Sequence, residues 1–256
     1  MILPEIDPII FQIGPIAVRW YSLTWLAAFY TIYILIKKYQ KDLNADQVND
    51  LMFYSLLGAI IGGRAGYVFF YSINQFFDNP LSIFFIWEGG LSFHGGLLGV
   101  LVACLWISRG WGVNFFWLMD RVAPFVPPGL GLVRLGNFMN SELLGRPTEM
   151  SWGVIFPSDP LGLTRHPSQL YQAIGEGILL FFYMLWVIKK PKPRMNISGH
   201  FLVGYGLIRF VTEFFRTPDQ HIGFSAFEVL TRGQLLCIPM IVIGMLLIYY
   251  SYRKQN

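Results

Sequence analysis

The sequence predicts an all-α polytopic membrane protein, and three observations lead to this fold class. Of its 256 residues, 54% are hydrophobic and 13% are charged, whereas a soluble domain has about 25% charged residues. The apolar residues form long runs separated by short polar segments, which excludes a disordered chain, a coiled coil and a disulfide scaffold. The lysines lie in a few clusters beside these runs. We therefore predict about seven transmembrane helices in a single domain covering residues 1–256.

Seven apolar segments approach the roughly 20 residues that a helix needs to cross the hydrocarbon core. In chain order they are Ala17–Ile36, Leu51–Tyr71, Leu91–Ser108, Phe115–Asn137, Gln169–Ile188, Gly199–Phe215 and Gln234–Tyr250. The fourth segment contains Pro124, Pro127 and Pro128, followed closely by Gly129 and Gly131. Irregular backbone at membrane depth is tolerated only where it is buried in protein or lines a cavity. We expect a cavity beside this segment.

The lysines indicate the orientation of the chain. They follow the first, fifth and seventh segments, at Lys37, Lys38, Lys41, Lys189, Lys190, Lys192 and Lys254. With seven spans, all of these positions lie on one side, and Arg109 and Arg194 agree. Basic residues that flank spans mark the cytoplasmic side. We therefore predict an N-terminus outside and a C-terminus in the cytoplasm.

The loops on the opposite side, Ser72–Gly90, Ser141–Ser168 and Arg216–Gly233, contain no lysine. The middle loop is the longest, is rich in Pro and Gly and contains Trp152, so we expect a small ordered cap at about residues 141–168. The N-terminal segment lacks the basic region of a signal peptide. Cys104 and Cys237 lie singly within apolar runs, as packing residues do. The net charge of +4 comes from residues that flank spans, so nucleic acid is not an expected partner.

Ionisable and polar side chains gather in the outer half of the predicted bundle. Each charge at the centre of a span costs about 2.5–3.5 kcal/mol, so such residues are functional candidates. The second, third and fourth segments contribute Arg64, His94, and Arg134 with Asn137. In the sixth segment Tyr205, Arg209 and Glu213 are spaced four apart and share one helical face, and Arg216 follows. The arginines at 64, 134, 209 and 216 outnumber the acids Glu142 and Glu213.

This excess of arginine predicts an anion site, and the planar guanidinium suits a bidentate grip on phosphate. A phospholipid head group is the natural anion at that depth. Because the site opens away from the cytoplasm, we expect no nucleotide cofactor, and no metal ligand set is evident. The imidazole of His94 can accept a proton from a thiol or hydroxyl while arginine holds a departing phosphate.

Structural alternatives exist for each of these residues. Arg209 and Glu213 can form an internal ion pair, and Arg64 can serve equally well as an interfacial anchor. A histidine in a span is often a packing residue, although the glycines around His94 favour a close approach by neighbours. Glu176 lies among small residues and is expected only to tie helices together.

Five motifs, in this order, closely resemble bacterial prolipoprotein diacylglyceryl transferases: GGRAGYVFFY, EGGLSFHGGLLG, GLVRLGNFMNSELLGR, RHPSQLYQ and GYGLIRFVTEFFRTPD. The resemblance covers essentially the whole chain. It implies a transferase that moves the diacylglyceryl group of phosphatidylglycerol to the lipobox cysteine of a prolipoprotein, forming a thioether and releasing glycerol phosphate. It also implies a bacterial inner-membrane protein with a periplasmic cap and an active site toward the outer leaflet.

The family's functional positions correspond to Tyr21, His94, Arg134, Asn137, Glu142, Gly145, Tyr205, Arg209, Glu213 and Arg216. The resemblance implies that Arg134 and Arg209 engage the lipid phosphate and that His94 is at or near the chemistry. The chain departs from the expected pattern at Gln172, where many relatives have Glu, and at Ser141, where Gly is expected.

The alternative functions are an anionic-lipid transporter and another membrane enzyme, either one that modifies lipids or a protease. An anionic-lipid transporter also places arginines in a cavity, but transporters usually contain repeats, and no repeat is visible here. An intramembrane serine protease needs a nucleophile elbow, and Ser92 in GGLSFHGG has the wrong surroundings. The oligomeric state does not follow from the sequence.

Overall fold

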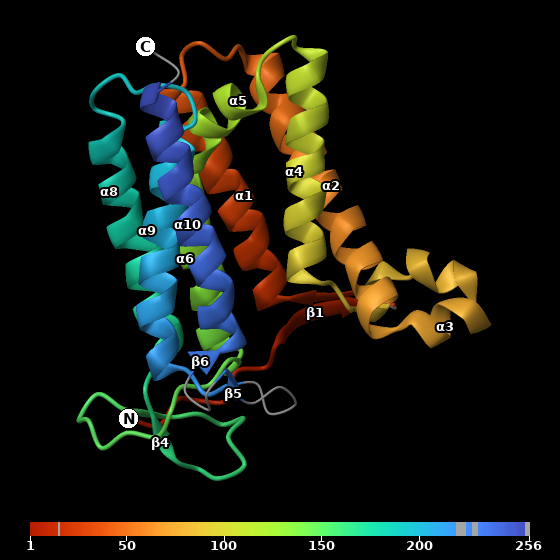
Figure 1. Cartoon of the computed structure of the whole chain (residues 1–256). Helices are drawn as coiled ribbons and strands as arrows, with labels where there is room; N and C mark the ends of the chain where they lie inside the picture. The colour runs from red at the N-terminus through yellow and green to blue at the C-terminus, as the bar shows by residue number, and fades with distance from the viewer. Residues whose placement is uncertain (15, 219–223, 227–229, 254–256) are drawn as a thin grey trace. The chain divides into compact units, whose positions relative to one another are not determined.

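The computed structural model describes residues 1–14, 16–218, 224–226 and 230–253 (Figure 1). Within these residues the chain is mostly helical. Its α-helices are α1 (Trp20–Tyr39), α2 (Ala45–Tyr71), α3 (Ile73–Asp78), α4 (Phe93–Gly110), α5 (Phe115–Val122), α6 (Val126–Met139), α7 (Ser168–Gln172), α8 (Leu180–Val187), α9 (Asn196–Thr212) and α10 (Arg232–Arg253). The short helical turns are η1 (Pro80–Phe84), η2 (Ile86–Glu88), η3 (Ala123–Phe125), η4 (Ala173–Leu179) and η5 (Glu213–Phe215). The described strands form two-stranded sheets: β1 (Ile9–Ile13) with β2 (Ile16–Arg19), β3 (Val154–Ile155) with β4 (Thr164–Arg165), and β5 (Phe224–Ala226) with β6 (Leu230–Thr231). The last two pairs are antiparallel.

The helical membrane class is confirmed. Each predicted segment coincides with a helix or a run of helices. Four described helices are long and apolar enough to cross a membrane: Ala45–Tyr71, Phe93–Gly110, Ser168–Val187 and Arg232–Arg253. Large apolar side chains are exposed along these helices, for example Leu98 on α4 and Trp186 on α8, as expected of surfaces that face lipid. The full set of seven crossings stays a prediction, and Lys254 lies outside the described residues.

Two helix boundaries differ from the sequence prediction for local reasons. Helix α2 begins at Ala45, not Leu51, because Asn44 and Gln47 form a capping box that starts the helix in a polar turn. The predicted fourth segment is divided into α5, η3 and α6. Pro124 lies within η3, and the two following prolines occupy the first turn of α6, where their missing N–H groups cost nothing.

The chain forms two compact units. The first comprises Met1–Phe11, Val18–Ile32 and Val122–Asn256, and the second comprises Gln12–Ala17 and Tyr33–Arg121. In the first unit, α9 packs along α10 (Figure 1). The helices approach so closely that a Cβ added at Gly199 would lie 2.8 Å from the Gly244 carbonyl oxygen. Small residues at a helix contact permit this backbone approach in an apolar environment.

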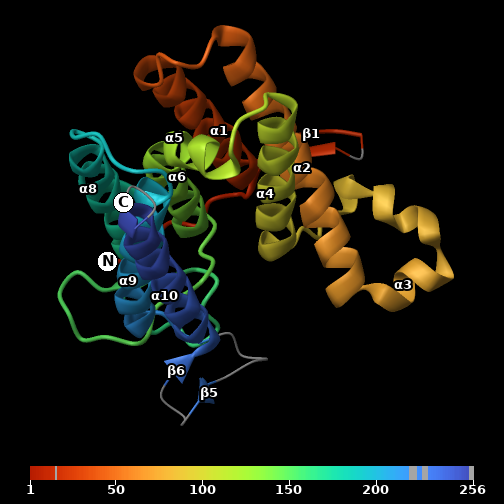
Figure 2. The same ribbon diagram turned by 45° about the horizontal axis from the view of Figure 1, so that its top comes forward.

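In the second unit, α2 and α4 lie side by side, and Figure 2 shows the same pairing from another direction. Glycines line the contact at four-residue intervals, namely Gly58, Gly62 and Gly66 on α2 with Gly95 and Gly99 on α4. An added Cβ at Gly99 would lie 1.9 Å from the Gly58 carbonyl oxygen. No side chain fits at that position without moving the helices apart. Cys104, on α4, is a buried free thiol, as is Cys237 on α10, so their predicted packing role is confirmed.

The predicted cap contains the β3–β4 hairpin. The N-terminal segment joins it, since the Leu3 amide donates to the Ile155 carbonyl over 3.0 Å. Leu3 packs with Val154 and Phe156 in a small apolar core. Asp159 and Arg165 form a buried bidentate ion pair, with N–O distances of 2.8 and 2.9 Å. The cap is therefore an ordered element with its own core.

Candidate active site

One wall of the site forms where α6 packs against η4, which is a π-helical segment. Gly131 and Gly177 meet backbone to backbone, since a Cβ added at Gly177 would lie 2.7 Å from the Gly131 Cα. Arg134 lies about one turn beyond Gly131, and Glu176 directly precedes Gly177. The close contact of the glycines therefore brings these two charged side chains face to face. π-Helical turns often occur at functional sites.

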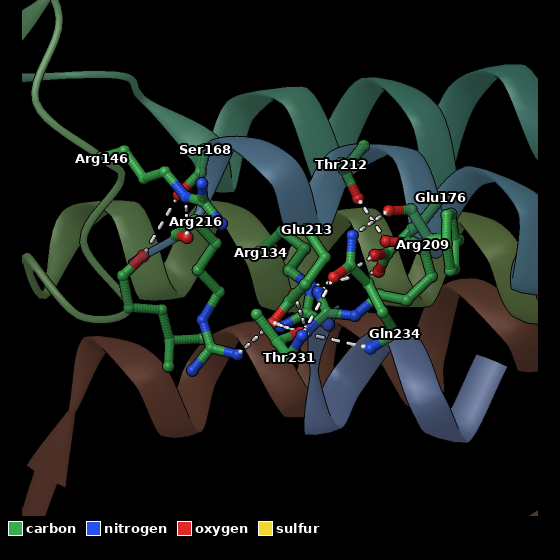
Figure 3. Close-up of polar contacts among 12 residues, drawn as sticks. Arg134, Arg146, Ser168, Glu176, Arg209, Thr212, Glu213, Arg216, Thr231 and Gln234 are labelled. Atoms are coloured by element: carbon green, nitrogen blue, oxygen red, sulfur yellow. Dashed lines mark hydrogen bonds and ion pairs between the residues drawn. The ribbon is translucent and has the colours of Figure 1, made fainter. Parts of the chain in front are cut away.

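Five charged side chains of the first unit form a continuous series of ion pairs, which we call the arginine–glutamate array (Figure 3). Its members, in order of contact, are Arg134, Glu176, Arg209, Glu213 and Arg216. Glu176 accepts from Arg134 Nε over 3.1 Å and from Arg209 Nη1 over 3.3 Å. The other two pairs are Arg209 Nη2 with Glu213 Oε2 at 2.8 Å and Arg216 Nη1 with Glu213 Oε1 at 3.2 Å. The array links α6, η4 and the end of α9.

The C-terminal end of the array is supported by α10 and the turn before it. The Thr231 hydroxyl donates to Glu213 Oε1 over 3.3 Å. A Cβ added at Gly233 would lie 2.9 Å from the same oxygen, so glycine makes room for the carboxylate. The predicted polar face of α9 is confirmed for Arg209 and Glu213, which pair at the i, i+4 spacing.

The array is buried but retains available donors. The side chain of Arg134 is 16% exposed, that of Arg209 is 12% exposed, and that of Glu176 is fully buried. Among the described residues, Arg134 donates a hydrogen bond only through Nε, to Glu176, and its Nη1 and Nη2 groups make no hydrogen bond. These two groups form the fork with which arginine grips phosphate oxygens. The array can therefore bind an anion without first breaking an ion pair.

The segment after α6 folds as a tight turn around Glu142. The Asn137 side chain donates to Glu142 Oε2 over 2.9 Å, and the Glu142 amide donates to the Asn137 carbonyl over 2.9 Å. Ser141 and Leu143 both adopt positive φ, at 53° and 54°. Such a backbone favours glycine, which explains why Gly is expected at position 141 and why serine is strained there.

Gly145 joins the cap to the end of α9. It forms an antiparallel bridge with Arg216, and the neighbouring Arg146 amide donates to the Phe215 carbonyl over 2.9 Å. A Cβ added at Gly145 would lie 2.0 Å from the His166 carbonyl oxygen. A side chain at position 145 would therefore clash with the backbone, and the contacts of Gly145 place Arg216 relative to the cap.

Tyr21 and Tyr205 belong to the same unit as the array. Tyr21 packs edge-on against Trp25 at 6.4 Å, and Tyr205 stacks on Phe201 at 6.0 Å. Neither phenol makes a hydrogen bond to the array among the described residues. Their place in the substrate site stays a prediction.

Arg64 belongs to the second unit, where backbone carbonyls surround its guanidinium. It donates to Ser82, Ile83, Gly89 and Gly90 over 2.5–3.3 Å and is 5% exposed. These bonds fix the segment between α2 and α4. They account for Arg64 as a structural residue, the alternative that the sequence had left open.

His94 also belongs to the second unit, in the first turn of α4. The residue is exposed, and its ring makes an edge contact with Phe93 at 5.7 Å. It lines an open pocket with Tyr67, Tyr71 and Leu91. No hydrogen-bond partner of either ring nitrogen is present among the described residues, so the imidazole is available for proton transfer.

Glu176 is the site residue that sequence reasoning undervalued. Its expected role was to tie helices, whereas the structure places it between the two arginines predicted to hold phosphate. Its position in the apolar fifth segment, between Gly175 and Gly177, was the available signal. With Glu176 included, the array has three positive and two negative side chains, a net charge of +1. In the part of the chain that the structure describes, no group of three or more His, Cys, Asp or Glu could hold a metal ion.

Comparison with known proteins identifies relatives over nearly the whole length. The family model described as prolipoprotein diacylglyceryl transferase matches residues 8–250. Proteins named phosphatidylglycerol–prolipoprotein diacylglyceryl transferase from Pseudomonas putida and Acinetobacter baumannii are each 47% identical over 98% of the chain, which corresponds to 96% and 95% of the relatives. A relative of the same name from Vibrio atlanticus is 47% identical over 99% of the chain and 93% of its own length.

Proposed function

The chain belongs to the prolipoprotein diacylglyceryl transferase family, and we propose that it transfers the diacylglyceryl group of phosphatidylglycerol to the lipobox cysteine of a prolipoprotein. The cysteine sulfur forms a bond to the glyceryl carbon, and the bond from that carbon to the phosphate oxygen breaks. The leaving oxygen keeps the electron pair, so glycerol phosphate departs with one more negative charge than the lipid phosphate had. The thiol proton passes to a base. The enzyme is a membrane transferase.

The observation that carries this proposal is the arginine–glutamate array, with two Arg134 donors left over. Charge develops on the phosphate oxygen as the carbon–oxygen bond breaks. Donors already aimed at that oxygen stabilise the transition state more than the ground state. We assign Arg134 and Arg209 to this task.

The remaining assignments rest on the local geometry and on the family resemblance. His94 is proposed as the proton acceptor, supported by its unpaired and exposed imidazole. We retain Tyr21, Asn137, Glu142, Gly145, Tyr205, Glu213 and Arg216 as substrate-site residues. Arg64, which was also predicted to contact substrate, is supported only as a structural residue.

We further propose seven transmembrane crossings in the bacterial inner membrane, with the N-terminus outside, the C-terminus in the cytoplasm and the active site toward the outer leaflet. The lysine clusters and the coincidence of helices with all seven apolar segments support this orientation. Single cysteines at Ser158 and Lys192 test it in intact cells. An impermeant reagent should label position 158 and not position 192, and the reverse pattern would contradict the orientation.

The direct test of function uses purified protein, phosphatidylglycerol labelled in its acyl chains and a lipobox peptide. We expect label to appear on the peptide in a thioether bond, with release of glycerol phosphate. A matched peptide with serine in place of cysteine should remain unlabelled. Movement of labelled lipid between leaflets, without peptide modification, would instead support the transporter alternative.

A further inference from the structure

Glu176 differs from the other carboxylate of the array in its partners. Glu213 is held by two arginines and by the Thr231 hydroxyl, so it is anchored to β6 as well as to α9. The described partners of Glu176 are Arg134 and Arg209 alone. The ion pairs of Glu176 therefore bear directly on these two guanidinium groups.

The contacts of Glu176 determine which edges of the arginines remain for a ligand. By taking Arg134 Nε, it leaves the Nη1 and Nη2 end of that side chain available. By taking Arg209 Nη1, it fixes a second guanidinium against the same carboxylate. One fully buried carboxylate therefore contacts both arginines, and Glu213 holds Arg209 from its other terminal nitrogen at 2.8 Å.

Glu176 also determines the charge of the array. The net charge is +1 with this carboxylate and would be +2 without it. A phosphodiester such as the lipid carries one negative charge, whereas a phosphate monoester carries about 1.5 to 2 at neutral pH. The net charge of +1 on the array balances the single negative charge of the lipid phosphodiester. The released monoester carries more negative charge than the array can balance, which favours its release.

We propose that Glu176 is a positioning residue that aligns Arg134 and Arg209 and limits the positive charge of the phosphate site, so that the phosphate monoester product is released. This inference rests on the proposed function for the identity of the product. It assigns the fully buried acid a role in turnover that goes beyond tying helices together.

Two substitutions separate charge from alignment. Glu176→Gln keeps the size and removes the charge. At about 6 Å and an effective dielectric constant of about 20, one unit charge changes anion affinity by about 100-fold. We expect the inhibition constant for glycerol 1-phosphate to fall by about 10- to 100-fold, with a smaller fall in KM for phosphatidylglycerol and a lower kcat because product leaves slowly.

Glu176→Asp keeps the charge and shortens the side chain, so that the carboxylate no longer reaches both arginines. We expect kcat/KM for transfer to fall by about tenfold, while the inhibition constant for glycerol 1-phosphate stays within about threefold of wild type. Asp159→Asn is the matched control, because it removes a buried carboxylate that pairs with arginine outside the array. It should leave the inhibition constant unchanged in the folded fraction.

An unchanged inhibition constant in an active Glu176→Gln variant would overturn the inference. Should that variant fail to insert, Glu176→Asp decides alone, and a shift of its inhibition constant in step with its loss of transfer would overturn the inference. Calorimetric titration of the same proteins with glycerol 1-phosphate requires no turnover. A wild-type protein that binds this probe but transfers nothing from phosphatidylglycerol would refute the proposed function and still test the role of Glu176.

Discussion

The helices of the α2–α4 pair and of the α6–η4 pair are both in close backbone contact, and among the described residues only in the α6–η4 pair does an ion pair join the two helices. Both rely on glycine contacts, at Gly58 and Gly99 in one pair and at Gly131 and Gly177 in the other. In α2–α4 the only buried arginine, Arg64, is saturated by backbone carbonyls. In α6–η4 an arginine faces a carboxylate and keeps donors to spare. Since glycine contact alone can hold helices together in an apolar setting, the extra charges indicate a ligand.

Substitution of His94, which lies in the second unit, should have the largest effect on activity. If its imidazole accepts the thiol proton, His94→Gln should lower the single-turnover transfer rate by about 10²–10⁴-fold while phosphatidylglycerol affinity is retained. Raising the pH should partly restore the rate, because free cysteine has a pKa of about 8.5. The transfer reaction would then depend on a residue of the second unit, which does not contain the arginine–glutamate array. An unchanged rate would mean that His94 only orders the start of α4.

The arginines provide the sharpest test within the comparison. Arg134→Lys keeps the charge but loses the planar fork, so we expect kcat/KM to fall by about 100-fold with normal membrane insertion. Arg209→Lys should behave alike. Arg64→Lys is the matched control, since it should lower the thermal melting temperature and leave transfer per folded molecule within about threefold. Equal losses of transfer in the Arg64 and Arg134 variants would contradict the assignment of Arg64 as structural and of Arg134 as phosphate-binding.

The cap gives a prediction for stability against pH. Hydrogen bonding by Arg165, with help from two backbone amides, lowers the pKa of Asp159 to about 2. A depressed carboxylate pKa contributes stability that is complete above about pH 4 and is lost as the pH falls toward 2. The contribution is on the order of 2 kcal/mol. Melting of wild type and Asp159→Asn should therefore converge as the pH is lowered from 5 to 2, and parallel curves would contradict the pKa.

The smallest expected effect concerns Ser141, at φ 53°. Ser141→Gly should relieve the strain of the left-handed backbone and raise the unfolding free energy by about 0.5–1 kcal/mol. Transfer activity should not change. A lower melting temperature would show that the serine contributes contacts which outweigh the strain.

The helical architecture could be predicted because it depends on local patterns. Apolar run length marked each long helix, and the i, i+4 spacing correctly placed Arg209 and Glu213 on one face, where they form the ion pair that the sequence offered as an alternative. The start of α2 was misplaced because the helix begins in a polar turn capped by Asn44, and hydropathy does not report caps. The composition of the cap correctly indicated an ordered element.

The partners of buried charges could not be predicted, because they depend on long-range packing. Arg64 binds carbonyls that lie 18 to 26 residues further along the chain. Glu176 meets Arg134 across 42 residues, through a glycine contact that no local pattern reveals. Counting charged residues in the outer half of the spans predicted a net positive cluster, and the array is net positive. The count included Arg64, which is not part of the array, and omitted Glu176, which is.

The strand-like contact between Leu3 and Ile155 has a consequence for the order of events during biosynthesis. The N-terminal residues leave the ribosome first, yet their partner is translated about 150 residues later. At 5–20 residues per second, this interval lasts roughly 8 to 30 s. During that time the N-terminal segment remains without this partner, while the helices α1 to α6 are synthesised behind it. The apolar side chain of Leu3 therefore reaches its buried position only after Val154 and Phe156 have been made.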